Sequence, residues 1–267
     1  MILLTRDELK NIAEDTVEIS KQKKYSIKGK TIEIRKKFHT KLYDEIFCNQ
    51  KPGKKEGKVS FVNKSVINEV IALREKEKIA VLNFASARNP GGGFLKGSSA
   101  QEESIARASN LYLSLKHFQK EFYNLNKEKN NPLYSDSIIF SRDISVFKRD
   151  NGSLLDLPIT INVLSCAAVN AGIARERGIK DELIDKCMQE RIRKIIHVAA
   201  EENTDYLILG AFGCGVFQNS DMKVAQMFKQ VLEKEGMKTC FKEVIFAIYD
   251  EPHKFNRFVR YYNAWLN

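Results

Sequence analysis

The sequence predicts an α/β fold in which helices cover both faces of a mostly parallel or mixed sheet. Two observations predict this class. Short, largely apolar segments of strand length alternate with longer amphipathic segments that have the period of a helix. The chain has 267 residues, of which 43% are hydrophobic and 29% charged, which suits one large domain or one domain with an extension.

The first 60 residues are predicted to form an extension that packs on the core. Residues 5–22 have helical periodicity, and Thr5 and Glu8 at their start form a Thr-x-x-Glu capping box. Residues 25–34 alternate in polarity around a glycine turn, which predicts a β-hairpin. We therefore expect residues 1–60 to form an N-terminal helix and hairpin extension.

The core domain, residues 61–267, is predicted to alternate between strand and helix after a loop at residues 51–55. Strands are expected at residues 78–86, 136–142, 159–168, 205–212 and 243–250. Helices are expected at residues 65–75, 101 to about 125, 180–203, 221–236 and 254–266. Ligands of such sheets bind beyond the carboxyl ends of strands. Two glycine-rich stretches follow predicted strands and therefore mark the expected binding site.

The composition restricts partners and location. The net charge is +10, and residues 1–60 hold 15 Lys and Arg against 9 Asp and Glu. A basic surface favours a polyanion such as nucleic acid, but lysines that only maintain solubility give the same charge. No apolar run reaches the roughly 18 residues that a membrane helix needs, and the apolar start is too short for a signal peptide. We expect a cytoplasmic monomer that does not contact membranes.

Metal and disulfide chemistry find little support in the sequence. The five cysteines and four histidines are widely separated, and no Cys-x-x-Cys occurs. We therefore expect no metal site and no cofactor. The cysteines are Cys48, Cys166, Cys187, Cys214 and Cys240.

The second of the two glycine-rich stretches, GAFGCGVF at residues 210–217, lies between an apolar strand and a helix. Glycines at such a position let successive backbone N–H groups point into one concavity, where they can bind phosphate oxygens. The spacing is neither that of a Walker loop nor that of a dinucleotide fingerprint. A tight turn between strand and helix would explain this stretch equally well.

The first stretch, NPGGGFLKGSSAQEES, contains three consecutive glycines and then two adjacent glutamates. Three glycines in a row leave main chain on which a flat polar ligand can lie. Ser98 or Ser99 is expected to cap a helix that carries Gln101, Glu102 and Glu103 in its first turn. Carboxylates there can also serve only to complement the helix dipole. Because adjacent helical residues point about 100° apart, the two glutamates cannot flank one atom as a conventional glycosidase pair does.

These residues together resemble a known family. PGGGFLKGSSAQEES is similar to the glycine-triplet, spacer and Gln-Glu-Glu motif of poly(ADP-ribose) glycohydrolases. VLNFASARNPGGGF and LILGAFGCGVFQN resemble the shorter, bacterial-type branch of that family, which belongs to the macrodomain superfamily. The resemblance covers most of the chain. It implies a three-layer macrodomain-like fold, a mixed sheet between helices, which binds ADP-ribose and hydrolyses the ribose–ribose O-glycosidic bond of poly(ADP-ribose).

The resemblance also implies roles for individual residues. Glu103 corresponds to the catalytic acid and Glu102 to the neighbour that fixes the ribose hydroxyls. Residues 166–170 are expected near the adenine. The implied substrate contacts are Asn89, Gly91, Gly92, Gly93, Gln101, Gly213, Cys214, Gly215, Val216 and Phe217.

The chemistry of the implied reaction suits these residue types. Cleavage of a glycosidic bond needs a proton on the leaving oxygen, which one neutral glutamic acid can donate and later regain from water. A second carboxyl group beside the acid, together with partial burial, favours the protonated form. Two alternatives stay open: a macrodomain that binds ADP-ribose without cutting it, and a hydrolase of mono-ADP-ribosyl groups or O-acetyl-ADP-ribose.

Overall fold

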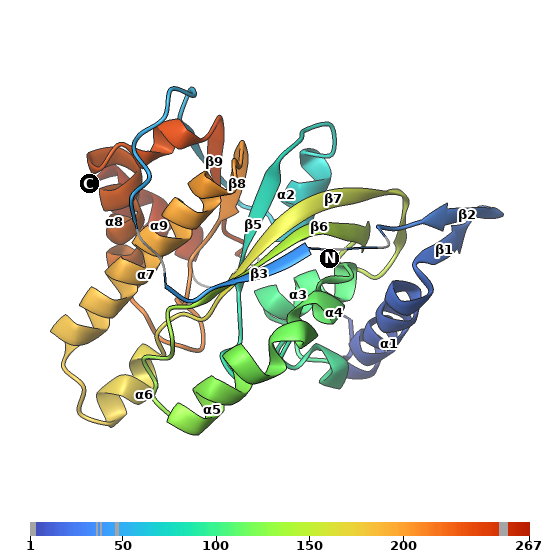
Figure 1. Ribbon diagram of the computed structural model, residues 1–267, viewed down its shortest axis with the longest axis horizontal. Helices are drawn as coiled ribbons and strands as arrows, with labels where there is room; N and C mark the ends of the chain where they lie inside the picture. Colours follow the sequence, from blue (N-terminus) through green and yellow to red (C-terminus); the bar gives the residue numbers. More distant parts are fainter. Residues whose placement is uncertain (1–3, 36, 38, 46–47, 251–255) are drawn as a thin grey trace.

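The computed structural model describes residues 4–35, 37, 39–45, 48–250 and 256–267. A seven-stranded mixed sheet with the order β3-β6-β7-β5-β8-β9-β4 lies between helices (Figure 1). Strands β7, β5, β8, β9 and β4 run parallel to one another, and β6 is antiparallel to both of its neighbours. This confirms the predicted mixed sheet between helices. The strands are β3 (His39–Tyr43), β4 (Lys58–Val62), β5 (Ile79–Phe84), β6 (Ile138–Lys148), β7 (Leu154–Cys166), β8 (Tyr206–Leu209) and β9 (Glu243–Ala247).

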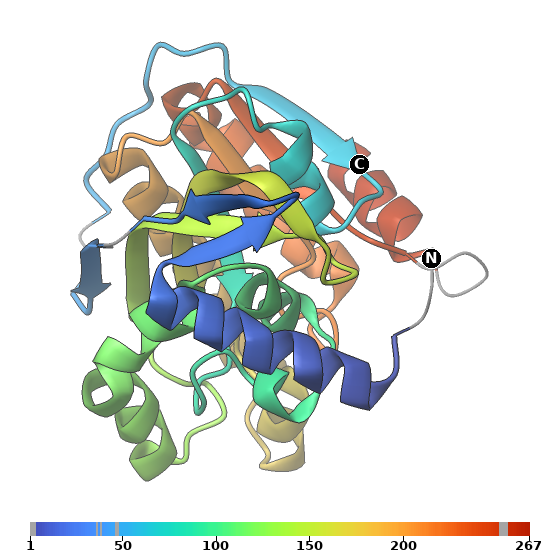
Figure 2. The same cartoon turned by 90° about the vertical axis from the view of Figure 1, so that its right-hand side faces the viewer.

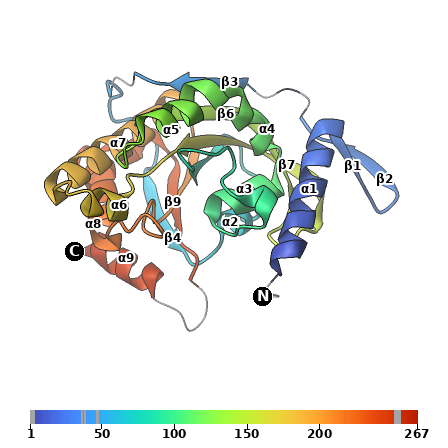
Figure 3. The ribbon, with the colours of Figure 1, turned by 90° about the horizontal axis from the view of Figure 1, so that it is seen from below.

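Helices cover the two faces of the sheet as separate groups (Figure 3). One face carries α7 (Asp181–Glu201), α8 (Asp221–Lys229) and α9 (Arg257–Leu266), and the other carries α2 (Val66–Ala72), α3 (Gln101–Ala108) and α4 (Leu111–Leu115). The short helices α5 (Leu125–Lys129) and α6 (Ala171–Glu176) lie near the carboxyl ends of the parallel strands. Residues 254 and 255, where the last helix was predicted to begin, lie outside the described residues.

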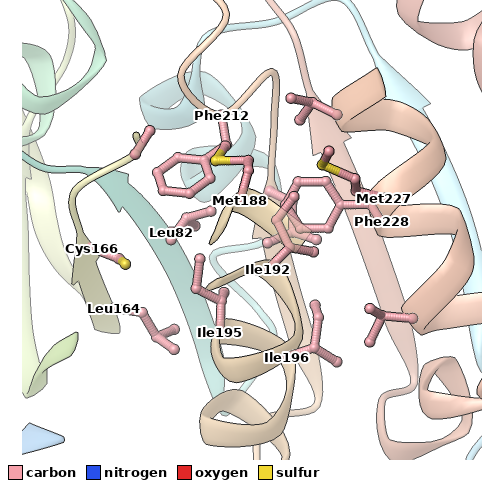
Figure 4. Packing of buried hydrophobic residues seen from close by; sticks show 14 of the residues in the cluster. Leu82, Leu164, Cys166, Met188, Ile192, Ile195, Ile196, Phe212, Met227 and Phe228 are labelled. Carbon is pink, nitrogen blue, oxygen red and sulfur yellow. The ribbon is translucent and has the colours of Figure 1, made fainter. Parts of the chain in front are cut away.

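Apolar side chains repeat along α7 with helical spacing and fill the core on its face of the sheet. Met188, Ile192 and Ile195 point toward Leu82 of β5 and Phe228 of α8 (Figure 4). All five are buried, and burial of one such side chain contributes about 1.5–3 kcal/mol. This packing fixes α7 and α8 against the central strands, whose ends carry the candidate site.

The helix predicted from residue 101 to about 125 is broken after Ala108. Ser109 has extended backbone geometry, and its hydroxyl donates a hydrogen bond to the carbonyl of Ile105 (2.7 Å). The Asn110 side chain accepts the backbone N–H of Ser145 on β6 (2.9 Å). Small polar side chains that bond to backbone in this way compete with helix continuation.

The N-terminal part forms helix α1 (Arg6–Gln22) and a two-stranded hairpin of β1 (Lys24–Ile27) and β2 (Lys30–Glu33). Both were predicted. The capping box is present, since Glu8 accepts the Thr5 N–H (2.6 Å) and Thr5 Oγ1 accepts the Glu8 N–H (3.3 Å). The hairpin is separate from the main sheet.

The extension is shorter than the predicted 1–60. Strand β3 and the first three residues of β4 come from that range, although β3 and β4 are the two edge strands of the central sheet. The expected boundary therefore falls inside β4. Both strands are short and carry lysines, Lys41 and Lys58. These features are typical of edge strands. Because neither strand is a long apolar run, the sequence pattern did not predict them. Among the described residues, no helix is long and apolar enough to cross a membrane.

Candidate active site

The two glycine-rich stretches lie at the same edge of the sheet, beyond the carboxyl ends of its parallel strands. β5 pairs in parallel with both β7 and β8, so the segments that follow these three strands emerge side by side. We call residues 85–100 the first glycine loop and residues 210–217 the second. The segment after β7 touches the second loop, because a methyl group on Gly213 would lie 2.6 Å from the Cβ of Ala168.

The glycine triplet lies directly against the two glutamates. Gly91 and Gly92 have left-handed backbone conformations, with φ of 68° and 60°. A methyl group on Gly92 would overlap Oε1 of Glu103 and come within 3.0 Å of Oε2 of Glu102. One on Gly93 would overlap the hydroxyl of Ser98. The triplet therefore brings main chain into contact with both carboxyl groups, at a distance that no side chain permits.

Helix α3 starts differently from the prediction. Its N-cap residue is Ala100, and neither Ser98 nor Ser99 caps the helix. The Glu103 carboxylate caps it instead by accepting the N–H of Ala100 at Oε2 (3.1 Å). Its other oxygen, Oε1, accepts the N–H of Gly93 (2.8 Å). Glu103 thus holds the triplet and the start of α3 together.

Glu102 is buried beside Glu103, against β5 and the start of the first glycine loop. Its Oε2 accepts the N–H of Ser86 (2.7 Å), and Asn83 on β5 donates to Oε1 (3.4 Å). The side chain is 3% exposed. Loss of solvent is the main reason that the pKa of Glu102 rises to about 8; the charge of Glu103 also raises it, and the N–H bonds oppose the rise. The group that burial keeps protonated near neutral pH is therefore Glu102.

This raised pKa makes stability depend on pH. An ordinary glutamate has a pKa of 4.5, so between there and about pH 8 the folded protein holds a proton that the unfolded chain has lost. The stability that this proton provides is fully present below pH 4.5, the ordinary pKa of glutamate, and is lost as the pH rises to about 8. Glu102→Gln keeps an acceptor for Ser86 but cannot ionise. We expect the melting temperature of wild type relative to this variant to fall between about pH 5 and about pH 8. A pH-independent difference would contradict a protonated Glu102.

Gln101 and Asn89 were both predicted to contact substrate. The side chain of Gln101 binds the backbone of β5, where it accepts the N–H of Phe84 (2.9 Å) and donates to the carbonyl of Leu82 (2.7 Å). It therefore braces α3 against the end of β5, beyond the point where the pairing of β5 with β8 ends. Asn89 is exposed on the first glycine loop, and its carbonyl accepts the N–H of Gly92 (3.0 Å).

The second glycine loop presents backbone to open space. A methyl group on Gly215 would meet no atom within 4 Å, and Val216 is 88% exposed. The Cys214 side chain is buried, its thiol donates to the carbonyl of Phe212 (3.5 Å), and burial raises the pKa of the thiol. Phe217 is half-buried, with its ring 5.9 Å from that of Tyr134. All five predicted residues of this loop lie together in sequence and space.

Several residues beside the site were not predicted. Asn83 pairs with Ser165 of β7, to which it donates a hydrogen bond (3.0 Å), so the support behind Glu102 comes from two strands. Arg191 of α7 is fully buried and donates to the carbonyls of Ala167 (2.7 Å) and Leu133 (2.9 Å). It thus ties the segment after β7 to the one that carries Tyr134. An arginine within an apolar helix face is the only sequence signal for it.

Within the described ranges, no three His, Cys, Asp or Glu side chains gather closely enough to hold a metal ion. The described residues bring two carboxyl groups and backbone N–H donors together at this edge of the sheet.

Comparison with known proteins assigns the family. Residues 13–149, half of the chain, match the family of the microbial-type poly(ADP-ribose) glycohydrolase (PARG) catalytic domain. No curated protein sequence matches the chain significantly.

Solved structures resemble the chain over nearly its whole length. Poly(ADP-ribose) glycohydrolase from Thermomonospora curvata is 29% identical with a TM-score of 0.85, and covers 97% of this chain and 99% of its own. Its complex with the inhibitor ADP-HPD gives 31% identity, a TM-score of 0.82, and coverage of 96% and 99%. Poly(ADP-ribose) glycohydrolase from Deinococcus radiodurans in complex with ADP-ribose is 30% identical with a TM-score of 0.74, and the match covers 98% of this chain and 91% of the other. The chain belongs to the microbial-type poly(ADP-ribose) glycohydrolases, a family of O-glycosyl hydrolases.

Proposed function

We propose that the chain hydrolyses the ribose–ribose O-glycosidic bond of poly(ADP-ribose) to release ADP-ribose, with Glu103 as the acid. One observation carries this assignment of roles. The Glu103 carboxyl lies at the start of α3 and bonds to the N–H of Gly93, so a ribose lying on the triplet would meet it directly.

The proposed reaction uses the two carboxyl groups unequally. A ribose lying on the triplet would cover the Glu103 carboxyl and exclude water from it, which favours the form of Glu103 that carries a proton. Glu103 faces the triplet and is the member placed to donate this proton to the leaving ribose oxygen. As that bond breaks, positive charge develops on the sugar, and the Glu103 carboxylate then accepts a proton from the attacking water.

Glu102 is proposed to hold the ribose rather than to attack it. Its bonds to Ser86 and Asn83 fix the carboxyl from behind, and a neutral carboxyl can both donate to and accept from a sugar hydroxyl. Both groups belong to the first turn of one helix and lie against one triplet. They therefore act on neighbouring parts of the ligand from the same side.

The second glycine loop is proposed to bind the diphosphate through backbone N–H groups. Gly215→Val tests this cleanly, because the space beside Gly215 is open and the free protein should keep its stability. We expect calorimetry to show an affinity for ADP-ribose at least about tenfold lower, or about 1.4 kcal/mol, with an unchanged melting temperature. Unchanged affinity would place the diphosphate elsewhere.

The substrate itself is tested by three assays in parallel. Purified protein is incubated with poly(ADP-ribose), with mono-ADP-ribosylated protein and with mono-ADP-ribosylated DNA, and released ADP-ribose is quantified. We expect release from the polymer. Release from the mono-ADP-ribosylated acceptors alone would replace the proposed substrate, and binding without release from any of them would mean that the protein is a reader of ADP-ribose.

We also propose a reducing, cytoplasmic location. All five cysteines are free thiols, three of them half-buried, and such a pattern supports a compartment in which thiols stay reduced.

A further inference from the structure

Helix α1 packs directly on the loop that carries the glycine triplet. It lies across the outer side of α3 in Figure 2, where it is the long blue helix in front. Ala13 of α1 forms a buried apolar cluster with Phe94 and Ala106. Arg6 donates to the carbonyl of Lys96 (2.8 Å), and Gly97 lies so close that a methyl group on it would overlap the carbonyl of Arg6.

A chain of hydrogen bonds joins α1 to the same loop from the other end. Lys148 of β6 donates to Thr16 Oγ1 (2.8 Å), and Thr16 donates to the carbonyl of Arg107 at the end of α3 (2.6 Å). The Arg107 guanidinium donates to the carbonyl of Ser98. Ser98 in turn lies against Gly93, whose N–H bonds to Glu103. This series of hydrogen bonds therefore begins in the central sheet and ends at the proposed acid.

Two of the side chains in this series of hydrogen bonds, Lys148 and Arg107, are buried cations. Lys148 is 1% exposed and also contacts the Asp15 carboxylate (2.6 Å) and the carbonyl of Ile12 (3.1 Å). Arg107 is 6% exposed. Burial lowers the pKa of both groups, and the nearby carboxylates Asp15 and Glu103 oppose that change. Buried charges are costly and require partners in fixed places, so each cation fixes the backbone that it contacts.

We infer that Thr16 and Arg107 are positioning residues for Glu103, and that α1 forms the back wall of the active site. This inference rests on the proposed function. It gives the N-terminal helix a role in the chemical step, so that changes in the helix should alter kcat. A helix that only captured polymer would instead alter KM.

The test is Thr16→Val, which keeps the shape of the side chain and removes both hydrogen bonds of its hydroxyl. Lys148 keeps Asp15 and Ile12 as partners, so no buried charge is left alone. We expect kcat on poly(ADP-ribose) to fall about tenfold or more, since small misplacements of a catalytic group have large effects. KM and the Kd for ADP-ribose should stay near wild type, and Thr16→Ser should restore kcat.

Ser20→Ala is the matched control. Ser20 is also a buried hydroxyl on α1, but it donates only to the carbonyl of Thr16 within the same helix (2.7 Å). We expect wild-type kcat with a similar fall in melting temperature. Arg107→Lys is a second variant, which keeps the charge but removes the guanidinium that donates to the carbonyl of Ser98, and it should lower kcat in the same way.

The outcomes separate the inference from the function beneath it. Thr16→Val with wild-type kcat, or a fall in kcat that tracks the melting temperature equally in Thr16→Val and Ser20→Ala, would overturn the positioning role. A higher KM at constant kcat would also overturn it and favour polymer capture by α1. Failure of wild type to cut poly(ADP-ribose) would instead defeat the proposed function.

Discussion

Glu103→Gln is expected to lower kcat on poly(ADP-ribose) by about 10²- to 10⁴-fold, the usual loss when general acid–base help is removed. Glutamine keeps the size of the side chain and an oxygen that can still accept the N–H of Gly93 or Ala100. It has no proton to transfer to the leaving oxygen. Because the lost interaction belongs to the transition state, the Kd for ADP-ribose should change little. Initial rates of polymer hydrolysis and calorimetric binding measure the two effects.

Glu182→Gln provides a comparison for that variant. Glu182 is also an acidic residue in the first turn of a helix, but it is exposed on α7. It should retain wild-type activity. If Glu103→Gln cuts the polymer at a rate near wild type, Glu103 is not the acid.

Gly92→Ala is expected to reduce kcat by at least about 10²-fold, because displacing a catalytic group by about 1 Å already has an effect of that size. The added methyl group would occupy the position of Glu103 Oε1 and crowd Glu102 Oε2. The carboxyl groups must move or the triplet must shift. The left-handed backbone of Gly92, with φ of 60°, adds a strain of about 1 kcal/mol.

Gly29→Ala separates backbone strain from the clash with the carboxyl groups. Gly29 in the β1–β2 turn has φ of 73°, and a methyl group there would meet nothing within 4 Å. This variant should lose about 1 kcal/mol of stability and keep its activity. Polymer hydrolysis and thermal unfolding of both variants decide the matter: equal activities would mean that the triplet does not need to be bare.

Local sequence patterns predicted much of the fold and the centre of the site. The capping box of Thr5 and Glu8, the hairpin around Gly29 and the apolar strand before the triplet depend on neighbours in the chain, and all are present. The family resemblance selected Glu102 and Glu103, which the structure places against the triplet.

Features that depend on distant partners could not be predicted in this way. Asn83 supports Glu102 only because β5 and β7 pair with Asn83 opposite Ser165. Gln101 is drawn to β5 by backbone groups at the strand end, which no spacing reveals. Ser98 lies against Gly93 and leaves the helix N-terminus to Glu103. Each of these outcomes is decided by tertiary contacts that compete with a local preference.

The contacts of α1 also bear on the order in which the protein is completed during synthesis. Thr16 meets Arg107 across 91 residues and Lys148 across 132. Contacts of such long range form slowly, because a large loop must close before they add stability. Helix α1 is made before both of these partners, and its contact with Lys148 must wait until β6 has been made. We therefore expect nascent chains that end before residue 148 to lack a fixed triplet loop, and ligand binding to begin only after more than half of the chain has been translated.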